Sequence, residues 1–198
     1  MNKKQLAIAL SKLEDVDEKN VKLEQYKTDS ELAALLLWKA FMNNDIEGKI
    51  IVDLGCGNGI LGLGALLLEA KKVYFVDVDE GVIELVEENT KDFKNKEIFN
   101  LDVNEFNKKV DTIIMNPPFG VQNEHADKKF LLKAFEIGKK IYSIHKIESK
   151  DFIEKLTEDN NWKVNGIEKL NFLIKKSYKF HKKEKYSVKV GIWELQKK

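Results

Sequence analysis

Short apolar runs alternate with segments of helical pattern from residue 50 to residue 195, and this order restricts the fold more than any other feature. The first run, Ile50-Ile51-Val52, is apolar throughout, which is typical of a parallel strand buried on both faces. Strands separated by helices of this length predict parallel crossovers, with helices on both faces of one sheet. The expected strands are residues 50–52, 73–76, 97–101, 110–115, 141–144, 162–174 and 186–195, and the helices between them are 61–70, 81–93, 130–139 and 152–157.

Ahead of the first strand the sequence predicts two further helices, over residues 4–20 and 33–42. Thr28-Asp29-Ser30-Glu31 has the spacing of a capping box, in which Thr28 caps the second helix and Glu31 reaches back to it. The predicted fold class is therefore α/β, a doubly wound, mostly parallel, seven-stranded Rossmann-like sheet with helices on both faces. We place the boundary of an N-terminal helical extension at residue 48, so that residues 49–198 form the sheet domain.

Composition limits the classes of protein to which the chain can belong. Its 198 residues are 43% hydrophobic and 34% charged, which suits a folded domain with a sizeable core and not a disordered chain. No apolar run is long enough to span a bilayer and the N-terminus has no signal-peptide core, so we expect a cytoplasmic protein. The single cysteine, Cys56, excludes an internal disulfide, and metal-ligand spacings are absent.

Basic residues gather near the end of the chain. Seven lysines and one acid, Glu184, lie between residues 175 and 189, although the net charge of the whole chain is only +1. Such a run is most often a solvated surface, but lysine charges also bind the phosphates of a nucleic acid. The chain has no arginine, so no bidentate guanidinium clamp is available. The candidate RNA-binding residues are Lys175, Lys176, Lys179, Lys182 and Lys183.

A glycine-rich turn after the first strand predicts a ligand site. Glycine allows a sharp bend and a close approach of the backbone to a ligand. In an open α/β sheet, ligands bind at the carboxyl ends of the strands. Three acids fall at those ends: Asp53 before the turn, Asp77 after the second strand and Asp102 after the third. Asp77 is placed to accept hydrogen bonds from a ribose diol, and Asp102 to accept one from the exocyclic amine of an adenine.

Three interpretations of this turn compete. Gly57-x-Gly59-x-x-Gly62 matches the dinucleotide-binding fingerprint, and Asp77 lies at a fitting distance along the chain. Against a dinucleotide, Asp53 stands where it would repel a pyrophosphate and attract a cationic ligand. S-adenosylmethionine is a cationic adenosine ligand and suits all three acids. A tight packing turn without a ligand is the third interpretation. We favour the methyl donor.

The chain has only two prolines, and they are adjacent in Asn116-Pro117-Pro118-Phe119. Proline cannot donate to a sheet ladder and fixes its own φ, so the pair ends the strand of residues 110–115 and stiffens the turn after it. Such a turn can hold the Asn116 amide, a proline carbonyl and the Phe119 ring in one arrangement. Two acceptor oxygens and a stacking ring suit a planar substrate with an NH2 group. The candidate catalytic residues are Asn116, Pro117, Pro118 and Phe119.

Taken together, Asp53-x-Gly55-x-Gly57-x-Gly59 and Asn116-Pro117-Pro118-Phe119 resemble a class I S-adenosylmethionine methyltransferase of the amino-group type. Leu23-Glu24-Gln25-Tyr26-Lys27-Thr28 is similar to the Leu-Glu-Gln-Tyr-Pro-Thr signature of the methyltransferase-like protein 5 family, with Lys27 in place of proline. The likeness extends to Tyr142-Ser143-Ile144-His145-Lys146 and to Phe180-His181-Lys182-Lys183. Members of this family make N6-methyladenosine in small-subunit ribosomal RNA, so the resemblance implies that reaction here.

The resemblance also implies roles for individual residues. Residues from the signature segment would enclose the methyl donor, the glycine turn would surround its amino-acid part, and Val103 would join Asp102 at the adenine ring. A small zinc-binding activator protein would add a strand to the sheet edge at residues 97–101. The complete set of expected donor-binding residues is Gln25, Tyr26, Thr28, Asp53, Gly55, Gly57, Asn58, Gly59, Ile60, Asp77, Asp102 and Val103.

Two alternatives stay open at this point. The same amine site would serve guanine N2 in RNA or a glutamine amide in a protein, because each is a planar amine; the segment of residues 23–28 favours adenine. A catalytically silent RNA-binding scaffold on the same fold is the second alternative. A base inside a duplex must be unpaired or flipped out to reach such a site. We expect His145 to be a structural hydrogen-bonding residue, and we assign Cys56 no nucleophilic role.

Overall fold

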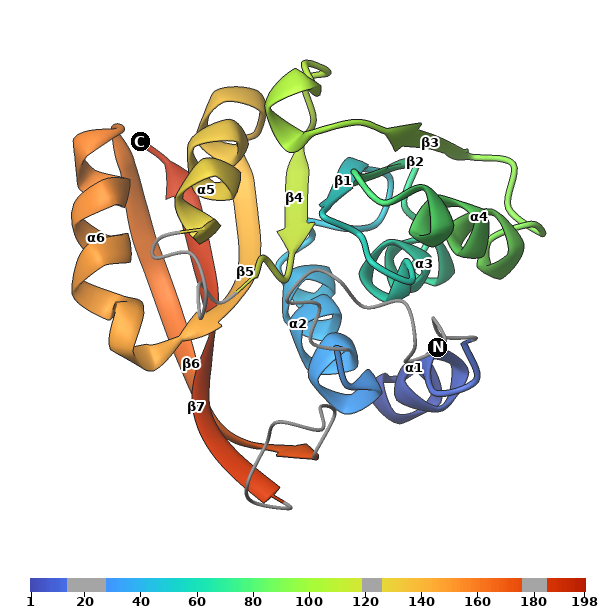
Figure 1. Cartoon of the computed structure of the whole chain (residues 1–198), viewed down its shortest axis with the longest axis horizontal. Helices are drawn as coiled ribbons and strands as arrows, with labels where there is room; N and C mark the ends of the chain where they lie inside the picture. The colour runs from blue at the N-terminus through green and yellow to red at the C-terminus, as the bar shows by residue number, and fades with distance from the viewer. Residues whose placement is uncertain (14–27, 119–125, 176–184) are drawn as a thin grey trace.

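The computed structural model describes residues 1–13, 28–118, 126–175 and 185–198. In these ranges a seven-stranded sheet lies between two groups of helices (Figure 1). The elements follow one another as α1 (Lys3–Leu10), α2 (Ser30–Met42), β1 (Ile50–Leu54), α3 (Ile60–Leu67), β2 (Lys72–Asp77), α4 (Glu80–Asn89), β3 (Lys96–Asn100), the 3-10 helix η2 (Val103–Glu105), β4 (Thr112–Met115), α5 (Ala126–Ile137), β5 (Lys140–Lys146), the 3-10 helix η3 (Ile147–Ser149), α6 (Lys150–Asp159), β6 (Trp162–Lys175) and β7 (Lys185–Lys197).

The strand order within the described part of the chain is β3-β2-β1-β4-β5-β7-β6. Strands β1 to β5 run parallel, whereas β7 lies between β5 and β6 and is antiparallel to both. The first strand of the sheet is β1. The next two strands, β2 and β3, are added on one side of it, and the chain then crosses to form β4 on the other side. At this reversal the connections after β1 and β4 diverge to opposite faces, which is where doubly wound proteins bind ligands. The predicted fold class is confirmed.

Two apolar cores hold the sheet between the helices. Successive strand residues point to opposite faces. Ile51 and Val73 therefore join helices α1 to α4 in one core, whereas Val52 and Tyr74 join α5 and α6 in the other. Burial on both faces explains the continuous apolar runs of the central strands. Leu6 of α1 lies in the first core, so the N-terminal helices pack directly with the sheet.

Several helix boundaries differ from the sequence prediction. Helix α1 ends at Leu10, well before residue 20, and residues 14–27 lie outside the described ranges. Helix α4 ends at Asn89, and the hydroxyl of Thr90 donates to the Val86 carbonyl at 2.6 Å as the chain turns towards β3. Among the described residues, none of the helices combines the length and the apolarity that a membrane crossing needs.

The cap of α2 is Asp29 and not Thr28, so the predicted capping box is wrong. The Asp29 carboxylate accepts hydrogen bonds from the backbone N–H groups of Glu31 and Leu32, at 2.9 and 3.3 Å. A negative carboxylate suits the positive N-terminal end of a helix better than a neutral hydroxyl, which explains the change of cap. The helix consequently begins at Ser30. This leaves the Thr28 hydroxyl available for another partner.

Candidate active site

The glycine-rich turn joins the end of β1 to the start of α3. Gly55, Gly57 and Gly59 have positive φ angles of +73°, +52° and +80°. A Cβ at Gly57 would have no atom within 4 Å, so the backbone faces open space there. A Cβ at Gly55 would lie 2.7 Å from the ring of Phe130, which packs against the turn. Gly57 is therefore the position at which a ligand can approach the backbone closely.

Side-chain oxygens accept hydrogen bonds from two of the backbone N–H groups in the first turn of α3. The Asp53 carboxylate accepts from the Gly62 N–H at 2.7 Å, and the side-chain oxygen of Asn58 accepts from the Ile60 N–H at 3.3 Å. In dinucleotide-binding folds, N–H groups at this helix end bind the pyrophosphate. Because two of these donors are already bonded within the chain, the geometry disfavours a dinucleotide ligand.

Asp53 supports the turn from inside the protein. The residue is only 1% exposed, and burial raises the pKa of its carboxyl well above the ordinary range. The hydrogen bond from Gly62 opposes this shift, and the nearby negative charge of Asp77 adds to it. The sequence pattern predicts that Asp53 binds the methyl donor. In the structure it has almost no surface for direct contact, so we assign it to fixing the turn on α3.

Asp77 ends β2 beside the turn. One carboxylate oxygen accepts from the Gly57 N–H at 3.0 Å and the other from the Asp79 N–H at 3.1 Å. Burial raises the pKa of this carboxyl, and hydrogen bonds from the backbone N–H groups of Gly57, Asp79 and Val78 oppose the shift. A carboxylate accepts up to about four hydrogen bonds, so Asp77 keeps acceptor capacity for a ligand. The remaining acceptor capacity agrees with a residue that accepts from a ribose hydroxyl group.

Val78 is a candidate site residue that the sequence pattern does not reveal. It follows Asp77 and is 57% exposed, whereas the apolar residues of β2 are buried. An exposed apolar side chain beside a hydrogen-bond acceptor suits a nucleoside, whose ring is apolar and whose sugar is polar. The available signal was the apolar residue between the two acids of Asp77-Val78-Asp79.

Asp102 precedes η2 and forms an ion pair. One carboxylate oxygen accepts from the Asn104 N–H at 2.9 Å, and the other lies 3.1 Å from the Lys129 ammonium nitrogen. The Asn104 hydrogen bond, followed by the contact with Lys129, lowers the pKa of Asp102. The side chain of Val103 is buried in the core, so an adenine could meet mainly its backbone. Lys129 could not be found from the sequence because it reaches Asp102 from α5.

Asn116 follows β4 at the same edge of the sheet. Its side-chain nitrogen donates to the Thr28 hydroxyl oxygen at 2.8 Å, although the two residues are 88 positions apart. Its side-chain oxygen is buried and has no hydrogen-bond partner within the described residues. Buried polar atoms are normally paired, so this acceptor has capacity for a hydrogen-bond donor that the described residues do not supply. Pro117 is buried next to it, and Pro118 is partly exposed.

Other predicted site residues lie outside the described ranges. These are Gln25, Tyr26, Phe119, Lys176, Lys179, Lys182 and Lys183. Lys175 is the last residue of β6. Their roles stay predictions of the sequence.

Two further residues near the site have structural roles. His145 on β5 is buried, and its Nδ1 lies 3.2 Å from the carboxylate of Asp127 in the first turn of α5. This contact joins α5 to the sheet, as expected for a structural hydrogen-bonding residue. At the turn, burial raises the pKa of the Cys56 thiol well above its ordinary value, and the charges of Asp53 and Asp77 add to the shift. A reactive thiolate is disfavoured there.

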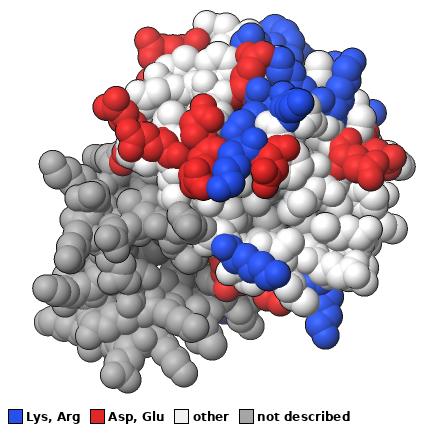
Figure 2. Space-filling view, turned by 90° about the vertical axis from the view of Figure 1, so that its right-hand side faces the viewer, with Lys and Arg blue, Asp and Glu red and all other residues white. Residues whose placement is uncertain are grey.

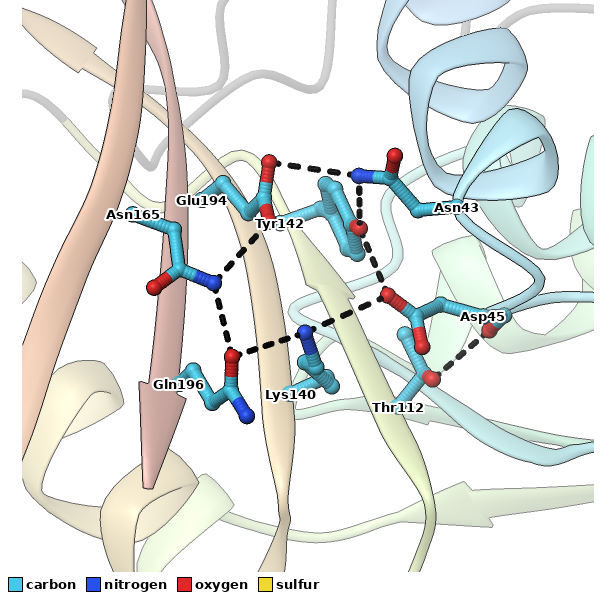
Figure 3. A network of polar contacts seen from close by, with 8 residues as sticks. All are labelled: Asn43, Asp45, Thr112, Lys140, Tyr142, Asn165, Glu194 and Gln196. Carbon is cyan, nitrogen blue, oxygen red and sulfur yellow. Dashed lines mark hydrogen bonds and ion pairs between the residues drawn. The ribbon is translucent and has the colours of Figure 1, made fainter. Parts of the chain in front are cut away.

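A polar network fixes the C-terminal end of α2 to the sheet (Figure 3). The Tyr142 hydroxyl donates to the Asp45 carboxylate at 2.7 Å and accepts from the Asn43 amide at 2.8 Å. The Thr112 hydroxyl donates to the Asp45 backbone carbonyl at 2.7 Å, and Asn43 also donates to Glu194 at 3.2 Å. Burial is the main cause that raises the pKa of Tyr142, so its phenol stays a donor. The network thereby holds α2 against β4, β5 and β7.

Comparison with known proteins agrees with this geometry. The model of the methyltransferase small-domain family matches residues 25–140, more than half of the chain. The matched range contains the glycine turn, Asp77, Asp102 and Asn116. The chain belongs to this methyltransferase family.

Relatives that match over nearly the whole chain place it in the METTL5 branch of these methyltransferases. It is 35% identical to the rRNA N(6)-adenosine-methyltransferase METTL5 of Danio rerio, over 96% of this chain and 96% of that protein. It is 38% identical to an uncharacterized protein of Methanocaldococcus jannaschii, over 100% of this chain and 95% of that protein. The crystal structure of PH1948 from Pyrococcus horikoshii matches with a TM-score of 0.92 and 46% identity, over 100% of this chain and 98% of that one. The family resemblance inferred from the sequence is confirmed.

Proposed function

We propose that this METTL5-family protein transfers a methyl group from S-adenosylmethionine to the N6 amine of an unpaired or flipped-out adenosine in RNA. The observation that carries the proposal is the buried side-chain oxygen of Asn116 at the carboxyl end of β4, which has no hydrogen-bond partner among the described residues. An exocyclic NH2 group supplies the donor that this atom lacks. The relative from Danio rerio is an rRNA N(6)-adenosine-methyltransferase, which supports ribosomal RNA as the substrate. The resemblance to the family implies the small-subunit RNA in particular.

The residues at the carboxyl edge fit the methyl donor. Gly57 leaves space against its backbone, Asp77 keeps lone pairs for ribose hydroxyl groups, and Val78 offers an apolar surface for the adenine ring. The lowered pKa of Asp102 keeps that carboxylate ionised as an acceptor for the exocyclic amine. When bound, S-adenosylmethionine supplies a methyl group on a positively charged sulfur.

Asn116 acts on the amine of the substrate. The lone pair of an aromatic amine is delocalised into its ring, so the amine is a weak nucleophile. The Asn116 side-chain oxygen and the Pro117 backbone carbonyl would accept its two N–H groups and draw the nitrogen towards a tetrahedral geometry. The lone pair then points out of the ring plane. Alignment of well-oriented reactants can contribute about 7–11 kcal/mol, and the proton can leave after transfer without a strong base.

The test is transfer of a tritiated methyl group from S-adenosylmethionine to unmodified small-subunit ribosomal RNA. The RNA is then digested to nucleosides and analysed by mass spectrometry. We expect the label in N6-methyladenosine. Label in N2-methylguanosine would keep the amine chemistry and overturn the choice of base. Absence of label from RNA, together with label in a protein glutamine or with no binding of the donor, would overturn the proposal.

We also propose that a small zinc-binding activator protein adds a strand to β3. Among the described strands, β3 lies at one edge of the sheet. The Val73 N–H donates to the Asn95 carbonyl and the Leu101 N–H donates to the Asp77 carbonyl, both at 3.0 Å. Along a parallel strand the backbone N–H and carbonyl groups of successive residues point alternately towards and away from the neighbouring strand. Asn95 and Leu101 point theirs towards β2, so those of Ile98 point away from β2. Its N–H and carbonyl groups are free to pair with an added strand.

Charged side chains cover this edge of the sheet. Lysine and acidic residues interleave on the face that contains α4 and β3 (Figure 2). Glu97 of β3 pairs with Lys72, and its other carboxylate oxygen lies 3.4 Å from the ammonium of Lys108. The ammonium groups of both lysines also lie 5.3 Å from the centre of the Tyr74 ring. Charges of this kind protect an exposed strand from unspecific pairing, so a partner must displace or complement them.

The roles of the lysines between residues 175 and 183 in RNA binding belong to the same proposal. The cytoplasmic location and the boundary at residue 48 also stay predictions of the sequence.

A further inference from the structure

The amide of Asn116 is held at one end only. Its nitrogen donates to the Thr28 hydroxyl oxygen at 2.8 Å, whereas its oxygen is buried without a partner in the described part of the chain. An amide is planar, and its two polar ends point in different directions. The hydrogen bond from the nitrogen to Thr28 fixes the plane of the amide, and in this orientation the oxygen is the end that has no partner in the described residues. If the amide rotated by half a turn, its NH2 group would meet the NH2 group of the substrate, and neither could accept.

The position of Thr28 is itself fixed by α2. The next residue, Asp29, caps the helix through the N–H groups of Glu31 and Leu32. One side of the helix is buried in the core, and the network around Asp45 and Tyr142 fixes its other end to the sheet. Thr28 therefore stands on a rigid support, although it belongs to a part of the chain far from β4 in sequence.

Prolines restrict the same asparagine from the other side. Pro117 and Pro118 limit the backbone that follows Asn116, and the asparagine itself comes directly after the last residue of β4. The backbone of Asn116 is thus set by the strand and the prolines, while the rotation of its amide depends on a side-chain partner. Among the described residues, the hydrogen bond to Thr28 supplies that partner.

We propose that Thr28 is a positioning residue for catalysis: its hydroxyl accepts from the Asn116 amide nitrogen and so holds the amide in the plane in which its oxygen faces the substrate amine. This inference rests on the proposed function, because it assigns the Asn116 oxygen to the amine. It differs from the role that the family resemblance implies for Thr28, which is enclosure of the methyl donor. The two roles predict different kinetics.

The test compares Thr28→Val with the matched control Thr28→Ser. Valine has nearly the shape of threonine but no hydroxyl, whereas serine keeps the hydroxyl. We expect Thr28→Val to lower kcat roughly tenfold, the value of one neutral hydrogen bond, with an unchanged Kd for S-adenosylmethionine. Thr28→Ser should stay close to the wild type. A normal kcat in Thr28→Val would overturn the proposal, and a weakened donor Kd with an unchanged kcat would assign Thr28 to the donor instead.

A double variant shows whether Thr28 acts through Asn116. If it does, Thr28→Val should add no further loss of kcat in an Asn116→Ala background, because the amide that it orients is gone. A full tenfold further loss of kcat would show that Thr28 and Asn116 act independently and would overturn the proposal.

An NMR measurement keeps this inference distinguishable from failure of the proposed function. The side-chain NH2 signals of Asn116, assigned by their loss in Asn116→Ala, should shift in Thr28→Val and stay in place in Thr28→Ser. This result does not depend on any substrate. Unshifted signals in Thr28→Val would exclude the hydrogen bond, and shifted signals with no methyl transfer to RNA by the wild type would locate the failure in the proposed function.

Discussion

Individual side chains at the carboxyl edge have separate tasks that their chemistry explains. Asn116 offers an acceptor without a partner among the described residues, and Asp77 offers acceptor capacity beside the exposed Val78. Asp53 is different, because it is buried and bonded to the first turn of α3. The acids of this edge are thus not equivalent, and variants of each should fail in different ways.

Replacement of Asn116 by alanine should separate binding from turnover. The variant loses the acceptor for the substrate amine but keeps the glycine turn, so we expect an unchanged Kd for S-adenosylmethionine. Misalignment of the amine should lower kcat by roughly a hundredfold. Calorimetry with the donor and single-turnover methylation of RNA measure the two quantities. A normal rate in Asn116→Ala would contradict the role of this amide.

Replacement of Asp53 by asparagine should reduce the pH dependence of stability. Burial raises the pKa of Asp53 in the folded chain. The stabilising contribution of its protonated form is complete below the unfolded pKa of about 3.9, and it is lost as the pH rises through the raised folded pKa. The wild type should therefore lose more stability than Asp53→Asn as the pH rises from about 4. Urea unfolding at several pH values measures the difference, and equal slopes would show that Asp53 titrates normally.

At the level of elements, the site is built from the ends of β1, β2, β4 and η2 together with the residues before α2. The turn between β1 and α3 and the first turn of α3 contain glycines with two different roles. Gly57 borders open space, whereas a Cβ at Gly62 would lie 2.1 Å from the Phe75 ring. The first glycine leaves room for a ligand, and the second leaves room for α3 to pack on β2.

Alanine at these two glycines should affect donor binding differently, although both variants lose some stability. Gly57→Ala strains a positive φ, at a cost of about 1–2 kcal/mol, and puts a methyl group in the ligand space. We expect weak or absent donor binding with modest loss of stability. Gly62→Ala overpacks the core and should cost about 1–3 kcal/mol, with donor affinity preserved in the folded fraction. Thermal unfolding and donor calorimetry on both variants check this; strong donor binding by Gly57→Ala would contradict the ligand position.

Proline at residue 98 should block the addition of a strand to β3. Proline removes the N–H of Ile98, which faces away from β2, and the variant should lose the complex with the zinc-binding activator while the sheet stays folded. Phe99 is a poorer target, because its ring packs 5.5 Å from that of Phe106. Ile98→Ala keeps the N–H and is the matched control. Co-purification with the activator is the measurement, and equal binding by both variants would place the interface elsewhere.

The whole molecule is one packing unit in its described parts. Helices α1 and α2 share a core with α3 and with Ile51 and Val73 of the sheet, so residues before 49 are part of the same structure. The hydrogen bond between Thr28 and Asn116 also joins the segment before α2 to the proposed site after β4. An N-terminal extension of this kind is integral to the proposed catalytic centre.

RNA binding belongs to the scale of the whole surface and should depend on salt. Replacement of Lys182 and Lys183 by glutamine should reduce the slope of log affinity against log salt by about 0.7 for each phosphate that the variant no longer neutralises. Lys3→Gln with Lys4→Gln, on exposed positions of α1, is the matched control for total charge. Filter binding at several salt concentrations measures the slopes. Equal slopes for both double variants would show that the lysines near residue 180 do not bind RNA.

The fold class, the order of the elements, the glycine turn and the turn after β4 could all be predicted from the sequence. These features depend on local physics: apolar periodicity, the conformations open to glycine and those closed to proline. The sequence predicts the cap of α2 one residue too early because both Thr28 and Asp29 are good local caps, and only the competition between them in the folded chain selects the carboxylate.

Which side chains meet at the site is settled only by packing in three dimensions. Packing pairs Thr28 with Asn116, joins Lys129 to Asp102, buries Asp53 and exposes Val78. Each outcome depends on how distant elements pack, and side chains at element ends have no periodicity that predicts their direction. The proposed catalytic amide could be recognised from its own sequence motif, but the hydroxyl proposed to orient it becomes visible only when α2 is packed against the sheet.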